Sequence, residues 1–215
     1  MSEELTKGKD TVLKLVIFAS GAGTTMQAVI DAIECGKLNA EIGLVISNNK
    51  GAGALERAAK AGIGTYVIRA KKNDPGAIDA ELMEVLEEYN PDLILLLGYL
   101  WKIGDGLIAR YPMRIVNTHP ALLPEKDGPG EFGGPGMHGE KVYEKVLAAG
   151  VKETGATLHY VMSEQEYDAG PVIKQVKVPV GLGDDAQTLA AKVQEKEKVQ
   201  LVDWLIGQAK AKEAT

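Results

Sequence analysis

The sequence predicts an α/β fold: a Rossmann-like, mostly parallel twisted sheet flanked by helices. Two features of the first 155 residues predict it. Short runs rich in Val, Ile and Leu have the length and composition of buried strands, and amphipathic helical segments separate them. A third feature is a change of pattern after about residue 155, where two more strands and a long terminal helix are expected.

The predicted elements follow one another with short connections. The strands expected in the first part cover residues 12–18, 41–46, 65–68, 93–97 and 114–116, and helices include 25–34 and 54–61. Residues 156–161 and 172–180 predict the later strands, and residues 184–205 predict the terminal helix. Asp184 and Asp185 favour the start of that helix, because the N-terminal end of a helix attracts negative charge.

Length and composition are typical of one large domain. The chain has 215 residues, of which 45% are hydrophobic, so it can bury a sizeable core. We expect a single domain over residues 11–207. The polar ends, rich in Lys, Glu and Ala, predict flexible tails over residues 1–10 and 208–215.

The charge and the apolar pattern exclude several classes of partner. Thirty acidic and 24 basic residues give a net charge of −6, the wrong sign for general binding to nucleic acid or to an anionic membrane. The longest apolar stretch, residues 93–101, is far shorter than the roughly 20 residues of a membrane helix, and the first residues lack a signal-peptide pattern. We expect a cytoplasmic monomer or homodimer that acts on small molecules.

A glycine-rich turn, Ser20-Gly21-Ala22-Gly23-Thr24-Thr25, lies between the first predicted strand and the first helix. Glycines allow close backbone approach to a ligand, and the free N–H groups of a helix start attract anions. The turn therefore favours phosphate binding. Met26 occupies the third glycine position of a dinucleotide fingerprint and no Gly-Lys-Ser/Thr follows, so neither dinucleotide nor P-loop binding is indicated. A turn whose threonines only cap the helix is the alternative.

Asn117 and His119 directly follow a predicted strand, where α/β proteins commonly carry their chemistry. Strand alternation puts both side chains on the same side, so an amide donor and an imidazole could meet at one carbonyl oxygen. That pair suits oxyanion stabilisation and proton transfer. All three histidines, His119, His138 and His159, lie in one stretch that leads to Asp168. A core histidine and an ordinary turn aspartate are the structural alternatives.

Residues 125–137 contain five glycines and two prolines, which predicts an irregular loop directly after the histidine segment. The loop could cover a site or simply connect two elements, and composition does not decide between them. The histidines and Asp168 lack the spacing common among metal ligands, so no metal site is expected.

Seven segments together closely resemble the folate-dependent formyltransferases, and especially those that formylate glycinamide ribonucleotide in purine biosynthesis. The likeness spans roughly residues 13–205. The Asn-x-His-Pro-(Ser/Ala)-Leu-Leu-Pro element and the later Asp-x-Gly-Pro are specific to the family, whereas the glycine turn alone would be weak. In chain order the segments are Ser20-Gly-Ala-Gly-Thr, Val45-Ile-Ser-Asn, Leu55-Glu-Arg-Ala, Gly98-Tyr-Leu, Asn117-Thr-His-Pro-Ala-Leu-Leu-Pro, Gly155-Ala-Thr-Leu-His and Asp168-Ala-Gly-Pro.

The resemblance implies a formyltransferase fold and transfer of a formyl group from the co-substrate 10-formyltetrahydrofolate to the amine of glycinamide ribonucleotide. It implies that Asn117, His119 and Asp168 are catalytic. Asn117 and protonated His119 would stabilise the oxyanion, and Asp168 would orient the imidazole.

The resemblance also implies two binding regions. Gly23, Thr24 and Thr25 would hold the substrate phosphate, and Glu197 would contact the ribose or glycinamide part. The folate would lie against Asn117 and the segment Leu100, Trp101, Lys102 and Ile103, and His159 would support the site.

Four positions depart from the common family pattern. Thr25 stands where asparagine is frequent, Trp101 where arginine or lysine is usual, and Tyr143 where a histidine often follows the loop; Pro75 replaces an arginine that usually contacts the folate. These departures keep three alternatives open: a sugar-amine formyltransferase, a deformylase in which water replaces the amine, and a catalytically silent nucleotide- or folate-binding protein.

Overall fold

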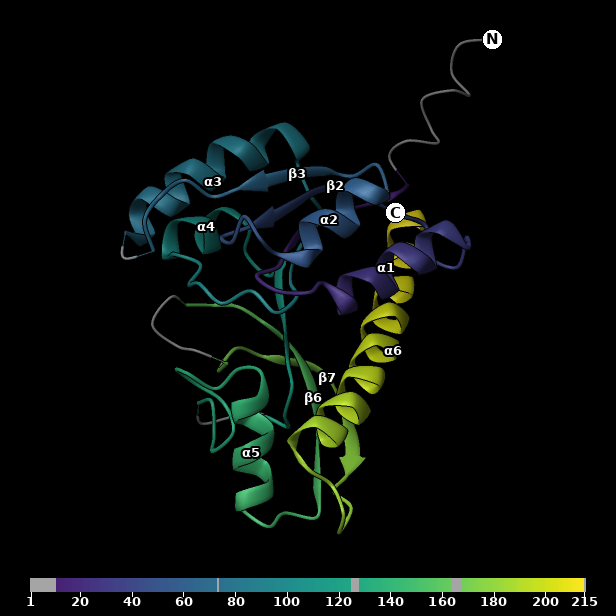
Figure 1. Cartoon of the computed structure of the whole chain (residues 1–215). Coiled ribbons are helices and arrows are strands. Elements are labelled where there is room, and N and C mark those ends of the chain that lie inside the picture. The colour runs from purple at the N-terminus through teal and green to yellow at the C-terminus, as the bar shows by residue number, and fades with distance from the viewer. Residues whose placement is uncertain (1–10, 73, 125–127, 164–167, 215) are drawn as a thin grey trace.

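The computed structural model describes residues 11–72, 74–124, 128–163 and 168–214. Its seven strands form one sheet in the order β3-β2-β1-β4-β5-β6-β7 (Figure 1). The strands are β1 (Leu13–Phe18), β2 (Ala40–Ser47), β3 (Gly64–Val67), β4 (Leu93–Leu96), β5 (Ile115–His119), β6 (Glu153–Tyr160) and β7 (Val172–Pro179). The first five are parallel, and β6 and β7 are antiparallel to their neighbours. The predicted α/β fold is confirmed.

The order in which the chain adds strands to the sheet reverses at the boundary between β1 and β4. From β1 it proceeds to β2 and β3 on one side, and then returns to place β4 on the other side. Crevices at the carboxyl ends of strands on either side of such a point are the usual ligand sites of open α/β sheets. The turns after β1, β4 and β5 meet there.

Six helices of the described residues cover the two faces of the sheet (Figure 1). Apolar residues alternate along β1, so that Leu15 and Ile17 pack with α1, α2 and the end of α6, whereas Val16 and Phe18 pack with α3 and α4. A third cluster joins α5 and the first half of α6 to β6 and β7. The helices are α1 (Thr24–Glu34), α2 (Gly53–Lys60), α3 (Pro75–Tyr89), α4 (Asp105–Arg110), α5 (Glu140–Ala148) and α6 (Ala186–Glu213).

Helix α6 is longer than predicted. It begins at the expected place, where Asp185 and Thr188 form a reciprocal capping box. It does not end near residue 205 but runs to Glu213, so residues 208–213 are helical and not a flexible tail. Ala209 is buried in the core, and the Lys212 ammonium pairs with Asp92 at the start of β4. These contacts between distant parts of the chain order the last two turns.

Strand β5 also extends beyond its predicted end. It continues from Val116 to His119 because antiparallel pairing with β6 places Asn117 opposite His159 and His119 opposite Thr157. The expected tail at residues 1–10 lies outside the described residues. Within the part of the chain that the structure describes, no helix combines the length and apolar character needed to cross a membrane.

Candidate active site

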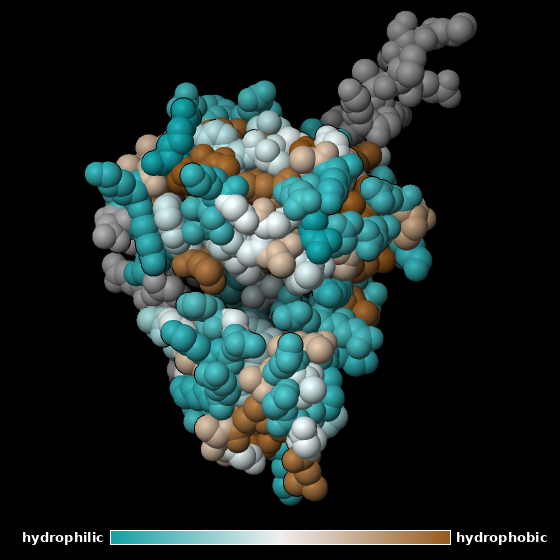
Figure 2. All heavy atoms as spheres, in the orientation of Figure 1, coloured by the Kyte–Doolittle hydropathy of each residue, from teal (hydrophilic) through white to brown (hydrophobic). Residues whose placement is uncertain are grey.

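A cavity of about 1190 Å³ opens at the carboxyl ends of β1, β4 and β5. In Figure 2 the surface is hollowed between the part containing α1 to α4 and the part containing α5. The volume exceeds the roughly 300–1,000 Å³ common for a single small-molecule site, which leaves space for two ligands. Every residue predicted to be catalytic or to bind a substrate lines this cavity: Gly23, Thr24, Thr25, Leu100, Trp101, Lys102, Ile103, Asn117, His119, Asp168 and Glu197.

The glycine-rich turn forms one end of the cavity. Gly23 precedes α1 with a φ of 72°, a conformation that favours glycine. A Cβ at this position would lie 2.7 Å from the Cα of Ala54, so the start of α2 packs directly on the turn. The Ala54 N–H donates to Gly21, and the Arg57 guanidinium donates to the Ala22 carbonyl. Contacts with α2 therefore fix the turn on one side, and on the other side residues 21–25 line the cavity.

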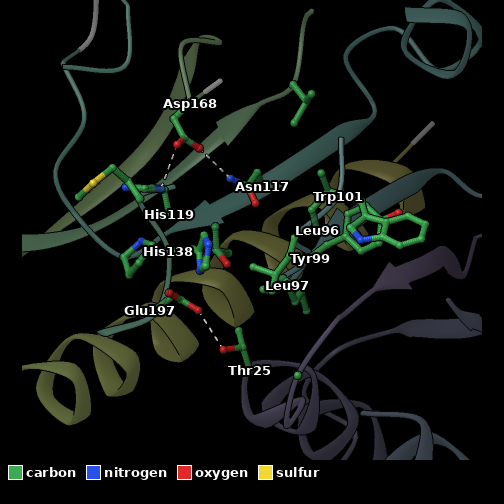
Figure 3. Close-up of a pocket in the computed structure, with 18 of the residues that line it drawn as sticks. Thr25, Leu96, Leu97, Tyr99, Trp101, Asn117, His119, His138, Asp168 and Glu197 are labelled. Atoms are coloured by element: carbon green, nitrogen blue, oxygen red, sulfur yellow. Dashed lines mark hydrogen bonds and ion pairs between the residues drawn. The ribbon is translucent and has the colours of Figure 1, made fainter. Parts of the chain in front are cut away.

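His119 and Asp168 form the centre of the site (Figure 3). The Nδ1 of His119 lies 3.4 Å from Oδ2 of Asp168; the His119 side chain is buried and the Asp168 side chain is 12% exposed. On the other side of the ring, Nε2 lies 2.8 Å from the carbonyl oxygen of Phe132. Because both ring nitrogens face acceptors, a doubly protonated imidazole satisfies this geometry. The Phe132 oxygen marks a position where His119 can stabilise an oxygen of a substrate.

Asn117 lies beside this pair, and its amide contacts two other residues of the site. Its Nδ2 lies 3.0 Å from Nε2 of His159 and 3.3 Å from Oδ1 of Asp168. Both amide hydrogens are therefore engaged within the site instead of facing open space. His159 uses its other nitrogen, Nδ1, on the carbonyl of Tyr160 at 3.0 Å, so it supports the site from behind.

The turn that carries Asp168 is tightly constrained. Asp168 has a φ of 50°, in the left-handed region that is uncommon for residues other than glycine. A Cβ at Gly170 would lie 1.8 Å from the carbonyl oxygen of Tyr160, so only glycine fits there. Pro171 then accepts a hydrogen bond from the Tyr160 N–H. The Asp-x-Gly-Pro pattern thus places the carboxylate by close packing against the end of β6.

Asp168 is ionised under ordinary conditions. Its burial alone would raise its pKa, but hydrogen bonds from His119 and from the Gly134 N–H outweigh burial and hold the pKa well below the usual aspartate value. The Gly134 bond, 2.9 Å long, comes from the predicted glycine-rich loop. Residues 125–127 of that loop lie outside the described residues. The part from Gly128 to Met137 forms no helix or strand, and Gly134 to Met137 line the cavity.

Glu197 is a buried carboxylate beside the glycine-rich turn. It is 7% exposed, and Thr25 donates a 2.9 Å hydrogen bond to its Oε1 (Figure 3). Burial raises the pKa of Glu197, and the hydrogen bonds from Thr25 and Thr118 act in the opposite direction. A carboxylate desolvated in this way is a strong acceptor for the hydroxyl or ammonium groups of a ligand.

The wall formed by β4 and the segment after it is largely apolar. Leu96, Leu97 and Ile103 are buried, and Trp101 packs against the cluster that contains Leu96 and Ile103. Tyr99 adds a buried hydroxyl for which no described residue is a hydrogen-bond partner. Burial and the charge of Asp79 raise the pKa of Tyr99, so the phenol stays neutral. A flat aromatic ligand with polar edges, such as a pterin, fits this chemistry.

Several site residues were not predicted from the sequence. Tyr143 and His138 line the cavity, although the sequence singled them out only as a departure and as one of three histidines. The Phe132 carbonyl and Gly134 N–H are backbone groups, which a side-chain pattern cannot reveal. Their only signal was the density of glycines in the loop. Among the described residues, no group of three or more His, Cys, Asp or Glu side chains is arranged to hold a metal ion.

Comparisons with known proteins point to one family. The sequence model of the formyl transferase family matches residues 13–205. The chain is 36% identical over 186 residues to phosphoribosylglycinamide formyltransferase of Escherichia coli, covering 86% of this chain and 82% of that protein. It is 37% identical over 186 residues to the chloroplastic phosphoribosylglycinamide formyltransferase of Arabidopsis thaliana, where it spans 61% of the relative's length.

The solved structures agree with the sequence comparisons. The crystal structure of glycinamide ribonucleotide transformylase 1 from Symbiobacterium toebii superposes with a TM-score of 0.81 and 30% sequence identity. The superposition covers 94% of this chain and 89% of that one. The predicted formyltransferase fold is confirmed by this similarity.

Proposed function

The chain belongs to the formyl transferase family, and we propose that it transfers the formyl group of 10-formyltetrahydrofolate to the amine of glycinamide ribonucleotide. The convergence of His119, Asp168 and Asn117 in one cavity, between a phosphate-type turn and an apolar wall, carries the proposal. The relatives named phosphoribosylglycinamide formyltransferase support it.

In the proposed reaction the substrate amine attacks the formyl carbon, and negative charge develops on the formyl oxygen. His119 Nε2 would donate to that oxygen, which takes the place now held by the Phe132 carbonyl. Asp168 orients the imidazole through Nδ1 and balances its positive charge. Protons leaving the amine and reaching the folate nitrogen would pass through His119, directly or through water.

Asn117 would assist in the same step. Its longer contact, 3.3 Å to Asp168, is the one that we expect it to exchange for the formyl oxygen. The 3.0 Å contact to His159 would keep the amide oriented. The exchange adds a second donor to the oxyanion without moving β5.

The two substrates would occupy opposite ends of the cavity. The backbone of Gly23 and Thr24 at the start of α1 suits the ribonucleotide phosphate, and Glu197 suits its ribose or glycinamide part. The wall from Leu100 to Ile103, together with Asn117, would hold the folate. Both ligands would then meet at His119.

Turnover of 10-formyltetrahydrofolate, followed by absorbance with and without glycinamide ribonucleotide, tests the proposal. We expect turnover that requires the ribonucleotide and yields its formylated product. His119→Ala and Asp168→Asn should each lower kcat by roughly 10²–10⁴-fold, the range of general acid–base catalysis.

Other outcomes would overturn the proposal in different ways. Formate released without any amine would establish the deformylase. Formylation of an amino sugar but not of the ribonucleotide would assign a different acceptor. Ligand binding without turnover would indicate a silent binding protein.

A further inference from the structure

Two of the departures from the common family pattern meet at the same buried carboxylate. Thr25 donates its hydroxyl to Glu197 Oε1 at 2.9 Å, although the residues are 172 positions apart in the sequence. Tyr143 on α5 is 2% exposed, and its pKa is raised by burial and by the charge of Glu197. Both residues line the cavity beside Glu197. Two neutral hydroxyl groups therefore lie near the Glu197 carboxylate.

The Thr25 hydroxyl donates its hydrogen to Glu197. Thr25 is buried, and Figure 3 shows its hydroxyl directed at Glu197. Its backbone belongs to the turn, but its hydroxyl does not extend the phosphate-binding surface. Thr24, the preceding residue, is exposed and lines the cavity, so it remains for the phosphate.

We propose that Thr25 is a positioning residue: its hydroxyl fixes the Glu197 carboxylate at the acceptor end of the cavity and so sets the affinity for the acceptor. The inference rests on the proposed function, because it identifies Glu197 as a group that binds the acceptor. A buried carboxylate has several accessible rotamers, and the Thr25 hydrogen bond, together with that from Thr118, selects the rotamer that faces the cavity. The bond ties α1 to α6 at the place where the ribonucleotide would lie.

The matched variants are Thr25→Val, which keeps the shape and removes the donor, and Thr25→Ser, which keeps the donor. We expect Thr25→Val to raise KM for glycinamide ribonucleotide roughly tenfold, the effect of one hydrogen bond to a charged group, with little change in KM for the folate. Thr25→Ser should stay close to the wild-type chain. In a Glu197→Gln background, Thr25→Val should have little further effect, because the two residues act as a unit.

The titration of Glu197 supplies a second measurement that needs no turnover. The carboxylate is faced by Thr25 from α1, Thr118 and His119 from β5, and Tyr143 from α5, with Lys198 next to it on α6. Removing the Thr25 donor should raise the Glu197 pKa, as carbon-13 NMR of the labelled carboxyl group can detect. The acidic limb of kcat/KM for the acceptor should move to higher pH by the same amount.

The outcomes are distinct. A wild-type KM and an unchanged Glu197 titration in Thr25→Val would overturn the inference, as would an equal loss in Thr25→Ser. If the wild-type chain does not formylate glycinamide ribonucleotide, the proposed function fails instead. The NMR titration then still decides whether Thr25 controls Glu197.

Discussion

Glu197 is buried at a cost to stability that its position in the cavity explains. Burial raises the folded-state pKa of Glu197 above the usual value. The free energy of unfolding is therefore highest below the unfolded pKa, where the carboxyl group is protonated, and it falls as pH rises through the folded pKa and the buried group becomes charged. Glu197→Gln removes this penalty. We expect the variant to unfold at a higher temperature than the wild-type chain at about pH 8, with the difference shrinking towards about pH 4.

Thermal unfolding across this pH range measures the effect. Acceptor binding should weaken in the same variant, because the amide carries no charge. A Glu197→Gln variant that is less stable than the wild-type chain at every pH would show that burial of the charged carboxylate does not lower the free energy of unfolding.

Asp168 should behave in the opposite way. Its folded-state pKa is held low, so its contribution to stability is present above the usual aspartate pKa and is lost as pH falls through the folded value. Asp168→Asn should therefore be less stable than the wild-type chain at neutral pH and equally stable in strong acid. Urea unfolding at several pH values measures the difference. A constant difference at all pH values would contradict the assigned pKa.

The turn between β1 and α1 depends on its backbone conformation. Its two glycines, Gly21 and Gly23, differ in whether a side chain would fit at their position. Gly23→Ala would put a side chain in the left-handed region and against the Ala54 backbone, whereas a Cβ at Gly21 has nothing within 4 Å. We expect Gly23→Ala to cost about 2–4 kcal/mol of unfolding free energy and Gly21→Ala less than about 0.5 kcal/mol. Denaturant unfolding compares the pair; equal costs would show that packing of α2 on the turn is unimportant.

Helix α4 begins without a cap of its own and depends on α3. The Asp79 carboxylate accepts 3.0 Å hydrogen bonds from the N–H groups of Gly104 and Leu107, in a buried position. Asp79→Ala leaves both donors without a partner and should cost about 2–4 kcal/mol. The segment that lines the folate side of the cavity leads into this helix, so KM for the folate should also rise.

A control for Asp79 lies on the same helix. Asp74 caps α3 itself by accepting from the exposed Ala77 N–H. Asp74→Ala should cost only about 1 kcal/mol, as expected for an exposed N-cap, and leave KM for the folate unchanged. Equal unfolding midpoints for the two variants would show that α4 does not need the carboxylate from α3.

At the scale of the whole molecule, α6 connects the part of the fold that contains α1 and β1 with the part that contains α5, β6 and β7. Its first half packs with α5, β6 and β7, and its second half packs with α1 and β1. Lys212 at its end pairs with Asp92, which also accepts from the Lys14 N–H. Truncation after residue 207 should lower the unfolding free energy by about 1–3 kcal/mol, through lost apolar burial and a partly exposed ion pair.

Truncation after residue 213 is the matched control and should leave stability unchanged. If both truncated chains unfold at the same urea concentration as the full chain, residues 208–213 contribute nothing and the domain ends at residue 207, as the composition suggests.

Some of the site could be predicted from residue order because it depends on local patterns. The alternation that puts Asn117 and His119 on one side of a strand, and the glycines between β1 and α1, act within a few residues. The direction of the Asn117 amide could not be predicted. It depends on His159 and Asp168, which are 42 and 51 residues away.

The sequence by itself determined the fold class and the positions of most strands, and it singled out Asn117, His119 and Asp168 as candidate site residues, because hydrophobic periodicity and short motifs are local properties. Only the tertiary structure decided that Thr25 serves Glu197, that α6 reaches Glu213, and that backbone groups of the glycine-rich loop contact His119 and Asp168. These contacts join residues far apart in the chain, so they exist only after the sheet and its helices have packed together.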